Sequence, residues 1–267
     1  MGRESCVKRL KEITGHNAVK LTPSGDHAVF LAFLSAKQLG KKRILIPDQG
    51  GWLTYKEYPR LLDLEIIEVK TDYGIINLED LKNKAGKDSA LICAQPAGYF
   101  AEQPIKKISS ICTEKNCLLI TDISGSIGDK SLIDKNADFM VCSFGRWKPV
   151  SLCFGGSISA KKGFPKEISS LTGFPDELCE KLEAELSKAE EKTREWYELS
   201  KKIKEDLKSF KIIHPEKKGI NVVVEFCSEQ EKKEILKYCE RMHYEYTLCP
   251  RYIRVLEKAV SIEVKRL

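Results

Sequence analysis

The sequence lacks the features of several classes of protein. It has no run of about 18 apolar residues, the length that a membrane span needs, so we expect no membrane segment. Its start, MGRESCVKRL, has no apolar core of signal-peptide length, and we expect a cytoplasmic protein. No C-x-x-C pair occurs among the ten cysteines, which argues against a zinc site. We find no internal repeat and no low-complexity segment.

The charge of the chain excludes few classes of partner and favours none. The 267 residues carry a formal net charge of +6, and the lysines alternate with glutamates instead of clustering. Pairs of lysine and glutamate on helices explain this pattern, so we expect no nucleic-acid partner. The length suffices for one large domain with a smaller appendage.

Short apolar segments alternate with helical ones through the first 160 residues. Helical spacing or capping predicts helices at 4–16, 29–39, 55–62, 77–84 and 105–115. Apolar runs predict strands at 18–22, 43–47, 64–70, 89–94, 117–122, 138–143 and 156–160. This alternation is typical of βαβ units, so we expect an α/β fold with a mostly parallel sheet.

The pattern changes towards the C-terminus. A joint containing Gly and Pro at 163–175 precedes a long charged helix at 176–210. Strands are then expected at 219–226, 251–256 and 260–264, with a helix at 230–242. We therefore divide the chain into a large domain (1–165), a helical connector (166–210) and a small C-terminal α+β domain (211–267).

The segment SFGRWKPVSLCFGG, Ser143 to Gly156, holds one lysine, Lys148, between two predicted buried strands. A lysine held there faces a cavity, where desolvation favours the neutral, nucleophilic amine that forms Schiff bases. The alternative is a solvated turn lysine, of which this chain has many candidates.

A second segment, PSGDHA, follows the first predicted strand and opens a helix. The free N–H groups and the dipole of a helix start favour phosphate, so Ser24, Gly25, Asp26 and His27 form a candidate anion site. The alternative is an ordinary helix capped by Ser24.

Four further residues fall at or just after strand ends: Trp52, Gln95, Asp122 and Ser143. Ligands bind at the carboxyl ends of strands in such sheets, so we expect these residues to lie along one edge. Asp122 ends the apolar run CLLITD, where a carboxylate is costly unless it has a partner.

The order of these motifs resembles the fold-type I pyridoxal-phosphate enzymes, and most closely the DegT/DnrJ/StrS aminotransferase group. SGDHA is similar to that family's S-G-T-x-A turn, and DISGSIG to its D-A-A-Q-x-x-G segment. SFGRWKPVSLCFGG is similar to the family's S-F-x-x-x-K-x-x-x-x-G-x-G-G segment. QPAGYFAEQPIKKI resembles the strand, turn and helix that lie between the family's first two segments. The likeness covers about residues 18–160.

The resemblance implies a role for each matching residue. Lys148 would hold pyridoxal 5'-phosphate as a Schiff base and shuttle protons, and Asp122 would pair with the pyridinium nitrogen. Ser24, the amides of Gly25 to His27, and Ser143 would hold the phosphate. Further cofactor or substrate contacts would come from Trp52 or Tyr99, stacked on the ring, and from Gln95, Ser124 and Arg254, the last as a carboxylate clamp. A surface strand arginine is the alternative for Arg254, with Arg251 as a competitor.

The sequence departs from the family in three places. The family's glutamine falls at Gly125, so either Ser124 or Ser126 substitutes for it or the contact is missing. Asp26 stands where threonine is usual, and an acid beside a phosphate is unfavourable unless it turns away. Cys153 replaces the first glycine after Lys148, and the chain is shorter than is usual for the group.

The resemblance implies an aminotransferase that acts on a small amino or keto substrate. One alternative is a lyase, such as a desulfurase or a selenocysteine-synthase-like enzyme. The other is a degenerate relative that keeps the fold without catalysis. The resemblance also implies a homodimer, and the helix at 29–39 and the helix that begins at Asp176 are candidate interface elements. No metal is expected.

Overall fold

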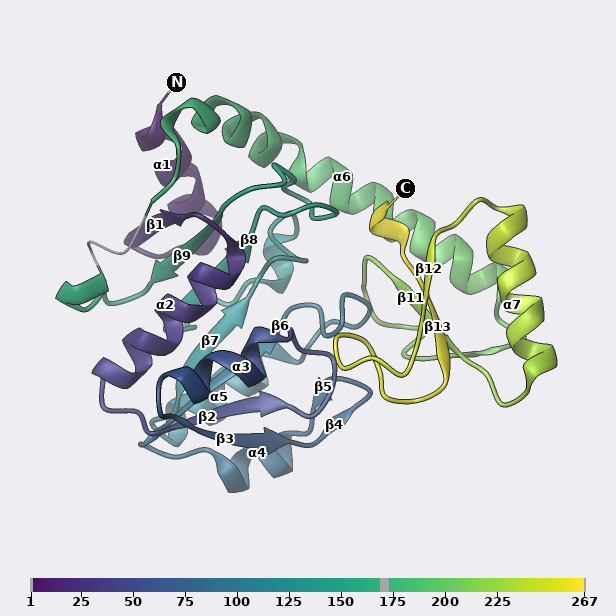
Figure 1. Ribbon diagram of the computed structural model, residues 1–267, viewed down its shortest axis with the longest axis horizontal. Coiled ribbons are helices and arrows are strands. Elements are labelled where there is room, and N and C mark those ends of the chain that lie inside the picture. The colour runs from purple at the N-terminus through teal and green to yellow at the C-terminus, as the bar shows by residue number, and fades with distance from the viewer. Residues whose placement is uncertain (1, 169–172, 267) are drawn as a thin grey trace.

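A seven-stranded sheet forms the centre of the larger part of the molecule (Figure 1). The structure is a computed structural model and describes residues 2–168 and 173–266. Five strands run parallel, β8 (Phe139–Ser143), β7 (Leu118–Asp122), β6 (Ser89–Ala94), β2 (Arg43–Pro47) and β3 (Glu65–Val69). At the other edge, β9 (Gly156–Ala160) runs antiparallel to both β8 and β1 (Ala18–Thr22). The predicted α/β class with a mostly parallel seven-stranded sheet is confirmed.

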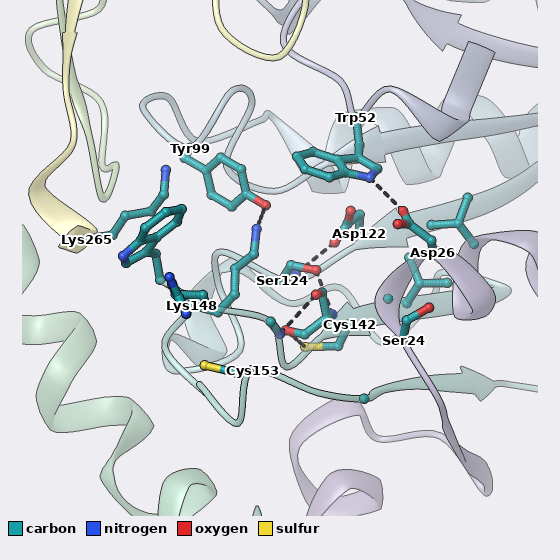
Figure 2. A pocket seen from close by; sticks show the side chains of 18 of the residues that line it. Ser24, Asp26, Trp52, Tyr99, Asp122, Ser124, Cys142, Lys148, Cys153 and Lys265 are labelled. Atoms are coloured by element: carbon teal, nitrogen blue, oxygen red, sulfur yellow. Dashed lines mark hydrogen bonds between the residues drawn. The ribbon is translucent and has the colours of Figure 1, made fainter. Parts of the chain in front are cut away.

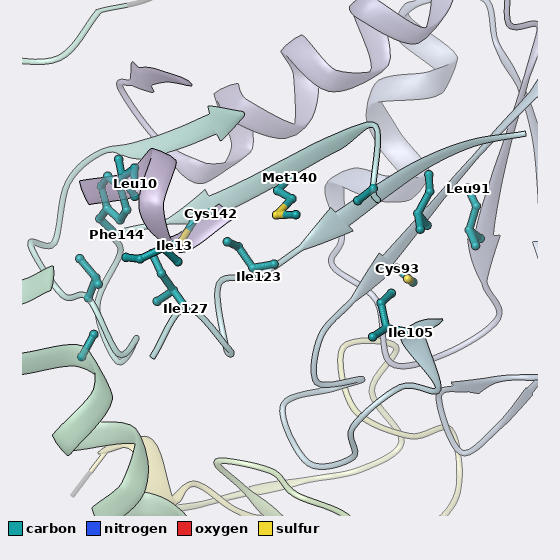
Figure 3. Close-up of a cluster of buried hydrophobic side chains, with 14 of the residues drawn as sticks. Leu10, Ile13, Leu91, Cys93, Ile105, Ile123, Ile127, Met140, Cys142 and Phe144 are labelled. Atoms are coloured by element: carbon teal, nitrogen blue, oxygen red, sulfur yellow. The ribbon is translucent and has the colours of Figure 1, made fainter. Parts of the chain in front are cut away.

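Both faces of this sheet are covered, which explains why β2, β6, β7 and β8 are nearly continuous apolar runs. Ile44 and Ile46 of β2 point to the face covered by α2 (Gly25–Gln38) and α3 (Thr54–Leu61). Leu45, between them, points to the opposite core. That core includes side chains from α1 (Arg3–Thr14), α4 (Leu78–Lys84) and α5 (Ile105–Glu114). Figure 3 shows Leu10 and Ile13 of α1 and Ile105 of α5.

The smaller part is an antiparallel sheet of four strands covered by a helix. Its order is β10 (Lys211–Ile212), β11 (Val222–Glu225), β13 (Ala259–Ile262) and β12 (Tyr246–Leu248), and its helix is α7 (Glu229–Arg241). A short hairpin of β4 (Thr71–Asp72) and β5 (Ile75–Ile76) lies outside both sheets. Short 3₁₀ turns occur at Lys130–Leu132, Lys166–Ile168, Asp176–Leu178 and Val264–Arg266.

One long helix, α6 (Cys179–Asp206), connects the two parts (Figure 1). Leu182 and Leu186, in its first half, are buried in the core of the larger part. Trp196 and Ile203, in its second half, are buried in the core of the smaller part. The helix therefore contributes to both cores and fixes one part against the other.

The strand predicted at 251–256 is wrong. These residues form a loop between β12 and β13, and the third strand of the small sheet is β12 instead. The reason lies in the pairing of β13, because Val260 is opposite Val224 on one side and Leu248 on the other. Both edges of β13 are occupied, so residues 251–256 do not pair with it. They turn back on themselves instead, with the Arg251 N–H donating to the Val255 carbonyl at 2.8 Å and the Arg254 N–H donating to the Arg251 carbonyl at 2.8 Å.

Two other expectations concern the joint between the two parts and the absence of a membrane span. The joint predicted at 163–175 includes residues 169–172, which lie outside the described residues. Within residues 2–168 and 173–266, no helix has both the length and the apolarity needed to cross a membrane.

Candidate active site

A cavity of about 520 Å³ opens where the carboxyl ends of the central strands meet the smaller part (Figure 2). This volume lies within the range of small-molecule sites. Loops after β2, β6, β7 and β8 supply one wall, and the C-terminal segment supplies another. The sequence-predicted residues that line it are Ser24, Gly25, Asp26, Trp52, Tyr99, Asp122, Ser124, Ser143, Lys148 and Arg254.

Lys148 reaches into the cavity from the loop between β8 and β9. Its ammonium donates a hydrogen bond to the hydroxyl of Tyr99 (Figure 2). The nitrogen lies 4.1 Å from the centre of the Tyr99 ring and 5.5 Å from that of Trp52. An amine held between aromatic rings, with one polar partner, is placed to react with a ligand in the cavity.

Asp122, at the end of β7, is only 8% exposed and is held by two donors. The Tyr55 hydroxyl donates to one carboxylate oxygen at 2.7 Å, and the backbone N–H of Ser124 donates to the other at 2.9 Å. Burial and the nearby Asp122 charge raise the pKa of Tyr55 well above its usual value. The phenol therefore stays protonated and fixes the carboxylate as an acceptor.

The start of α2 meets the ends of two strands at very short distances. A Cβ on Gly25 would lie 2.4 Å from Cβ of Ser143, and one on Gly156 would lie 2.9 Å from the Gly25 nitrogen. Only glycine permits this approach. The amides of Gly25 and Asp26 begin the helix and have no partner within it, so together with the helix dipole they favour an anion.

Asp26 is turned towards Trp52. Its carboxylate accepts a hydrogen bond from the indole N–H at 2.7 Å and another from the Thr54 hydroxyl at 3.3 Å (Figure 2). The acid in the place of the family's threonine thus fixes the orientation of an aromatic side chain at the cavity wall.

Tyr99 explains the glycine that replaces the family's glutamine. A Cβ on Gly125 would lie 2.9 Å from the Tyr99 ring, so the ring occupies the space a larger side chain would need. The neighbouring Ser124 hydroxyl accepts from the Ser143 N–H at 2.8 Å, and the Ser143 hydroxyl accepts from the Gly145 N–H at 3.2 Å. This chain of bonds ties the end of β7 to the end of β8.

Two predicted residues are not brought into the cavity. The Gln95 amide accepts from the Gln103 N–H at 2.8 Å and donates to the Leu132 carbonyl at 3.3 Å, and Gln95 does not line the cavity. The backbone N–H of His27 donates to the Ser24 hydroxyl at 3.0 Å, which makes Ser24 the N-cap of α2. His27 also lies outside the cavity lining. Both residues stabilise local structure.

Arg254 lines the cavity, but its guanidinium is engaged elsewhere. Its Nε and Nη2 donate to the Glu263 carboxylate at 2.8 to 3.1 Å, and Nη1 donates to the Ile253 carbonyl at 2.8 Å. The two parallel N–H groups that would clamp a substrate carboxylate are already used. The geometry gives the clamp role predicted for Arg254 no support.

Sequence reasoning missed two residues of the site. Tyr55 is the first-turn residue of α3 that holds Asp122, and Lys265 is a buried lysine that lines the cavity beside Tyr99. A sequence signal exists for Lys265, because polar Ser261, Glu263 and Lys265 alternate with apolar residues in and after β13. No local signal marks Tyr55, whose partner is 67 residues away in the sequence.

The fold is that of the fold-type I pyridoxal-phosphate enzymes. The structure superposes on DndA from Streptomyces lividans with a TM-score of 0.76 at 11% identity, covering 98% of this chain and 88% of that one. It superposes on a DegT DnrJ EryC1 StrS aminotransferase from Brucella abortus with a TM-score of 0.73 at 15% identity, covering 97% and 84%. A serine palmitoyltransferase from S. paucimobilis with a bound PLP–myriocin aldimine gives 0.71 at 12% identity, covering 97% and 70%.

Sequence comparison finds similar proteins among the glycine dehydrogenases. A probable glycine dehydrogenase (decarboxylating) subunit 2 from Thermotoga maritima is 26% identical over 182 residues, 63% of this chain and 38% of that protein. A probable subunit 1 from Staphylothermus marinus is 33% identical over 91 residues, 31% of this chain and 19% of that protein. The chain thus spans less than two fifths of the length of these curated relatives. Residues 190–267 match the MJ1341 family C-terminal domain.

Proposed function

We propose that this chain binds pyridoxal phosphate in the cavity and that Lys148 is the residue to which the cofactor attaches. The observation that carries the proposal is the position of the Lys148 amine, which faces the same cavity as the Asp122 carboxylate and the start of α2. The residues fit the cofactor, because the convergence at Gly25 leaves helix amides beside the cavity for a phosphate. The fold supports the same conclusion.

Each residue would have one task. Gly25, Asp26 and Ser143 would bind the phosphate, and Asp122 would accept an N–H from the pyridine ring. Trp52, fixed by Asp26, would limit the position of the ring from one side. When bound, the cofactor supplies an electron sink for bonds at the substrate's amino-bearing carbon.

Lys148 would carry the proton transfers, with Tyr99 as its partner. The amine and the Tyr99 hydroxyl are in hydrogen-bond contact, so a proton can pass between them without a change in backbone position. The aromatic rings of Tyr99 and Trp52 would limit the positions that the Lys148 amine can take.

The reaction we propose is amino transfer on a small amino acid or keto acid. The cavity lining contains five cationic side chains and two carboxylates; the cations are Arg146, Lys148, Arg254, Lys265 and Arg266. Cations that hold a substrate carboxylate stabilise it relative to carbon dioxide, so this lining favours reactions in which the substrate keeps its carboxylate.

A sulfur-removing lyase is the second candidate, because of Cys153. Its thiol is exposed and lines the cavity, five residues after Lys148. Such a cysteine could receive sulfur from a substrate at the cofactor. Among the structures similar to this one is a cysteine desulfurase from Thermococcus onnurineus NA1.

A donor screen on the cofactor-loaded protein tests the proposed reaction. Amino transfer predicts that an amino acid converts the bound cofactor to its aminated form, with a shift in the absorption spectrum, and that a keto acid reverses the shift. Sulfide release from cysteine that is abolished in Cys153→Ala would favour the lyase instead. Failure of the protein to bind the cofactor at all would contradict both.

A further inference from the structure

The end of α5 brings two cysteines together. Cys112 lies in the last turn of this helix, and Cys117 comes just before β7. Asn116, between them, has a φ of 54°, the left-handed conformation in which many helices end. The N–H of Cys117 donates to the Cys112 carbonyl at 2.9 Å, and the N–H of Asn116 donates to the Thr113 carbonyl at 3.2 Å. These are the two hydrogen bonds of a Schellman motif, in which the side chains of the first and last residues commonly touch.

In this motif both of those residues are cysteines. With ordinary bond lengths, the 2.9 Å hydrogen bond between their backbones keeps the two Cα atoms within about 7 Å of each other. A disulfide joins Cα atoms that are roughly 4.4–6.8 Å apart, so the turn holds the pair at a separation that a disulfide can span. Both cysteines are free thiols in the structure, and the Cys112 thiol donates a hydrogen bond to the Cys117 sulfur.

Cys117 has the surroundings of the more reactive member of the pair. The Ser89 hydroxyl donates to its sulfur at 3.3 Å, and the Lys41 ammonium donates to the carbonyl of the adjacent Asn116 at 2.9 Å. The hydrogen bond from Cys112 lowers the pKa of Cys117, and Ser89 and Lys41 lower it further, while burial opposes them. The same hydrogen bond, together with burial, raises the pKa of Cys112. Cys117 therefore gives up its proton before Cys112 does.

The pair lies beneath a single exposed turn. Cys112 and Cys117 are buried, whereas Thr113, Glu114 and Asn116, their neighbours in the sequence, are exposed. Helix ends open locally more easily than the centre of a domain. An oxidant little larger than water can therefore reach the sulfurs without global unfolding.

We propose that Cys112 and Cys117 are a redox-active pair that hydrogen peroxide oxidises to an intramolecular disulfide. The Cys117 thiolate attacks one oxygen of the peroxide, the O–O bond breaks, and the other oxygen leaves as hydroxide, which takes up the proton that the thiol released. The sulfur of Cys112 then attacks the sulfenic acid formed on Cys117. The S–S bond forms, and the sulfenic hydroxyl leaves with the Cys112 proton as water. One peroxide is thus reduced to two waters while two thiols are oxidised.

The disulfide would fasten the end of α5 to the start of β7. Asp122 lies at the other end of this strand, and neither cysteine lines the cavity. The redox pair is therefore separate from the proposed cofactor site, and its test needs no cofactor.

The test is peptide mapping of the folded, fully reduced protein after treatment with hydrogen peroxide. The remaining thiols are blocked with N-ethylmaleimide in denaturant before digestion. Trypsin cleaves after Lys115, between the two cysteines, so the disulfide joins peptides 108–115 and 116–130. We expect this linked pair, about 2 Da lighter than the two free peptides together. Dithiothreitol should separate it again.

Cys112→Ala and Cys117→Ala should each abolish the linked peptides, and dimedone should then label the sulfenic acid of Cys117 in Cys112→Ala. Cys239→Ala is the matched control, because Cys239 is also a buried cysteine in a helix, and it should leave the yield unchanged. The peroxide concentration is raised until the exposed Cys153 is oxidised. Recovery of Cys112 and Cys117 as maleimide adducts at that point, or a disulfide from either of them to Cys93, would overturn the proposal.

Discussion

Asp122 shows how one buried carboxylate is prepared for a ligand at the scale of a single residue. Two donors, the Tyr55 hydroxyl and the Ser124 N–H, fix both of its oxygens at the end of β7. Neither donor is a cation, so the negative charge of Asp122 remains for a positive partner from the cavity. The pyridinium nitrogen of the proposed cofactor is such a partner.

We expect Asp122→Ala to weaken pyridoxal-phosphate retention at least about tenfold and to remove most activity, because a charged hydrogen bond is lost. Equilibrium dialysis with detection of the cofactor's absorbance measures the retention. Tyr55→Phe serves as a comparison and should have a smaller effect, since it leaves the carboxylate in place. Retention and rate equal to those of the wild type in Asp122→Ala would exclude the pairing role.

Glu263 makes the stability of the smaller part depend on pH. Burial alone would raise its pKa, but the charges of Lys265 and Arg254 outweigh burial and hold the pKa far below its usual value. A carboxyl with a depressed folded pKa contributes stability above its unfolded pKa of about 4.3, and that contribution is lost as the pH falls towards the folded pKa.

Urea unfolding at pH 7 and pH 3 measures this contribution. We expect Glu263→Gln to lower the free energy of unfolding at pH 7 by about 3–5 kcal/mol, because it leaves buried cations without their partner. The variant should also lose less stability than the wild type on going to pH 3. Glu198→Gln, in an exposed pair with Lys201, is the control and should change little. An unaltered pH dependence in Glu263→Gln would show that Glu263 contributes no such linkage.

At the scale of elements, the start of α2 depends on close contact with two strand ends. Gly25→Ala would place its Cβ 2.4 Å from Cβ of Ser143, so the helix start would have to move. We expect a loss of about 1–3 kcal/mol in the free energy of unfolding and weaker binding of the cofactor's phosphate. Chemical unfolding and cofactor titration measure the two effects.

Gly2→Ala provides the control for this substitution, because nothing lies within 4 Å of its Cβ position. It should leave the affinity for the cofactor unchanged. If Gly25→Ala retains wild-type affinity for the cofactor, the start of α2 does not form the phosphate site.

The elements that the sequence predicts well are those buried on both sides. The strands β2, β6, β7 and β8 are apolar runs because each face meets a helix layer, so their position follows from composition alone. The loop at 251–256 has a similar pattern, but both edges of the following strand β13 are taken by β11 and β12, a property of the assembled sheet. Local sequence cannot show which edges are already paired.

The candidate site was predictable in part for a related reason. Residues at strand ends, such as Asp122 and Ser143, meet because parallel strands end at one edge. Lys265 escaped notice because a lysine near a chain end suggests a solvated surface, and its burial depends on Glu263 and Arg254. Pairings of this kind depend on tertiary structure.

At the scale of the whole molecule, we predict a homodimer. The sequence analysis named the helix at 29–39 as an interface element, but much of the apolar surface of α2 packs against the sheet. Trp147 and Phe154, at the cavity, are 39% and 40% exposed, and Leu53 is 51% exposed. Exposed apolar side chains beside a site are suited to a second subunit.

Sedimentation equilibrium of the cofactor-loaded protein should therefore give a dimer, and Phe154→Asp should shift it towards monomer. Leu61→Asp is the control, because Leu61 is 72% exposed at the end of α3. A monomer that retains bound cofactor at every concentration would rule out a site completed by two subunits.

The central claim is that Lys148, and no other lysine, holds the cofactor. Lys265 is the informative competitor, since its ammonium also faces Tyr99 in the same cavity. The direct measurement is borohydride reduction of the protein loaded with pyridoxal phosphate, followed by peptide mapping. We predict a single pyridoxyl label on Lys148, absent in Lys148→Ala and retained in Lys265→Met. A label on Lys265 or on any other lysine, or no label at all, would contradict the account.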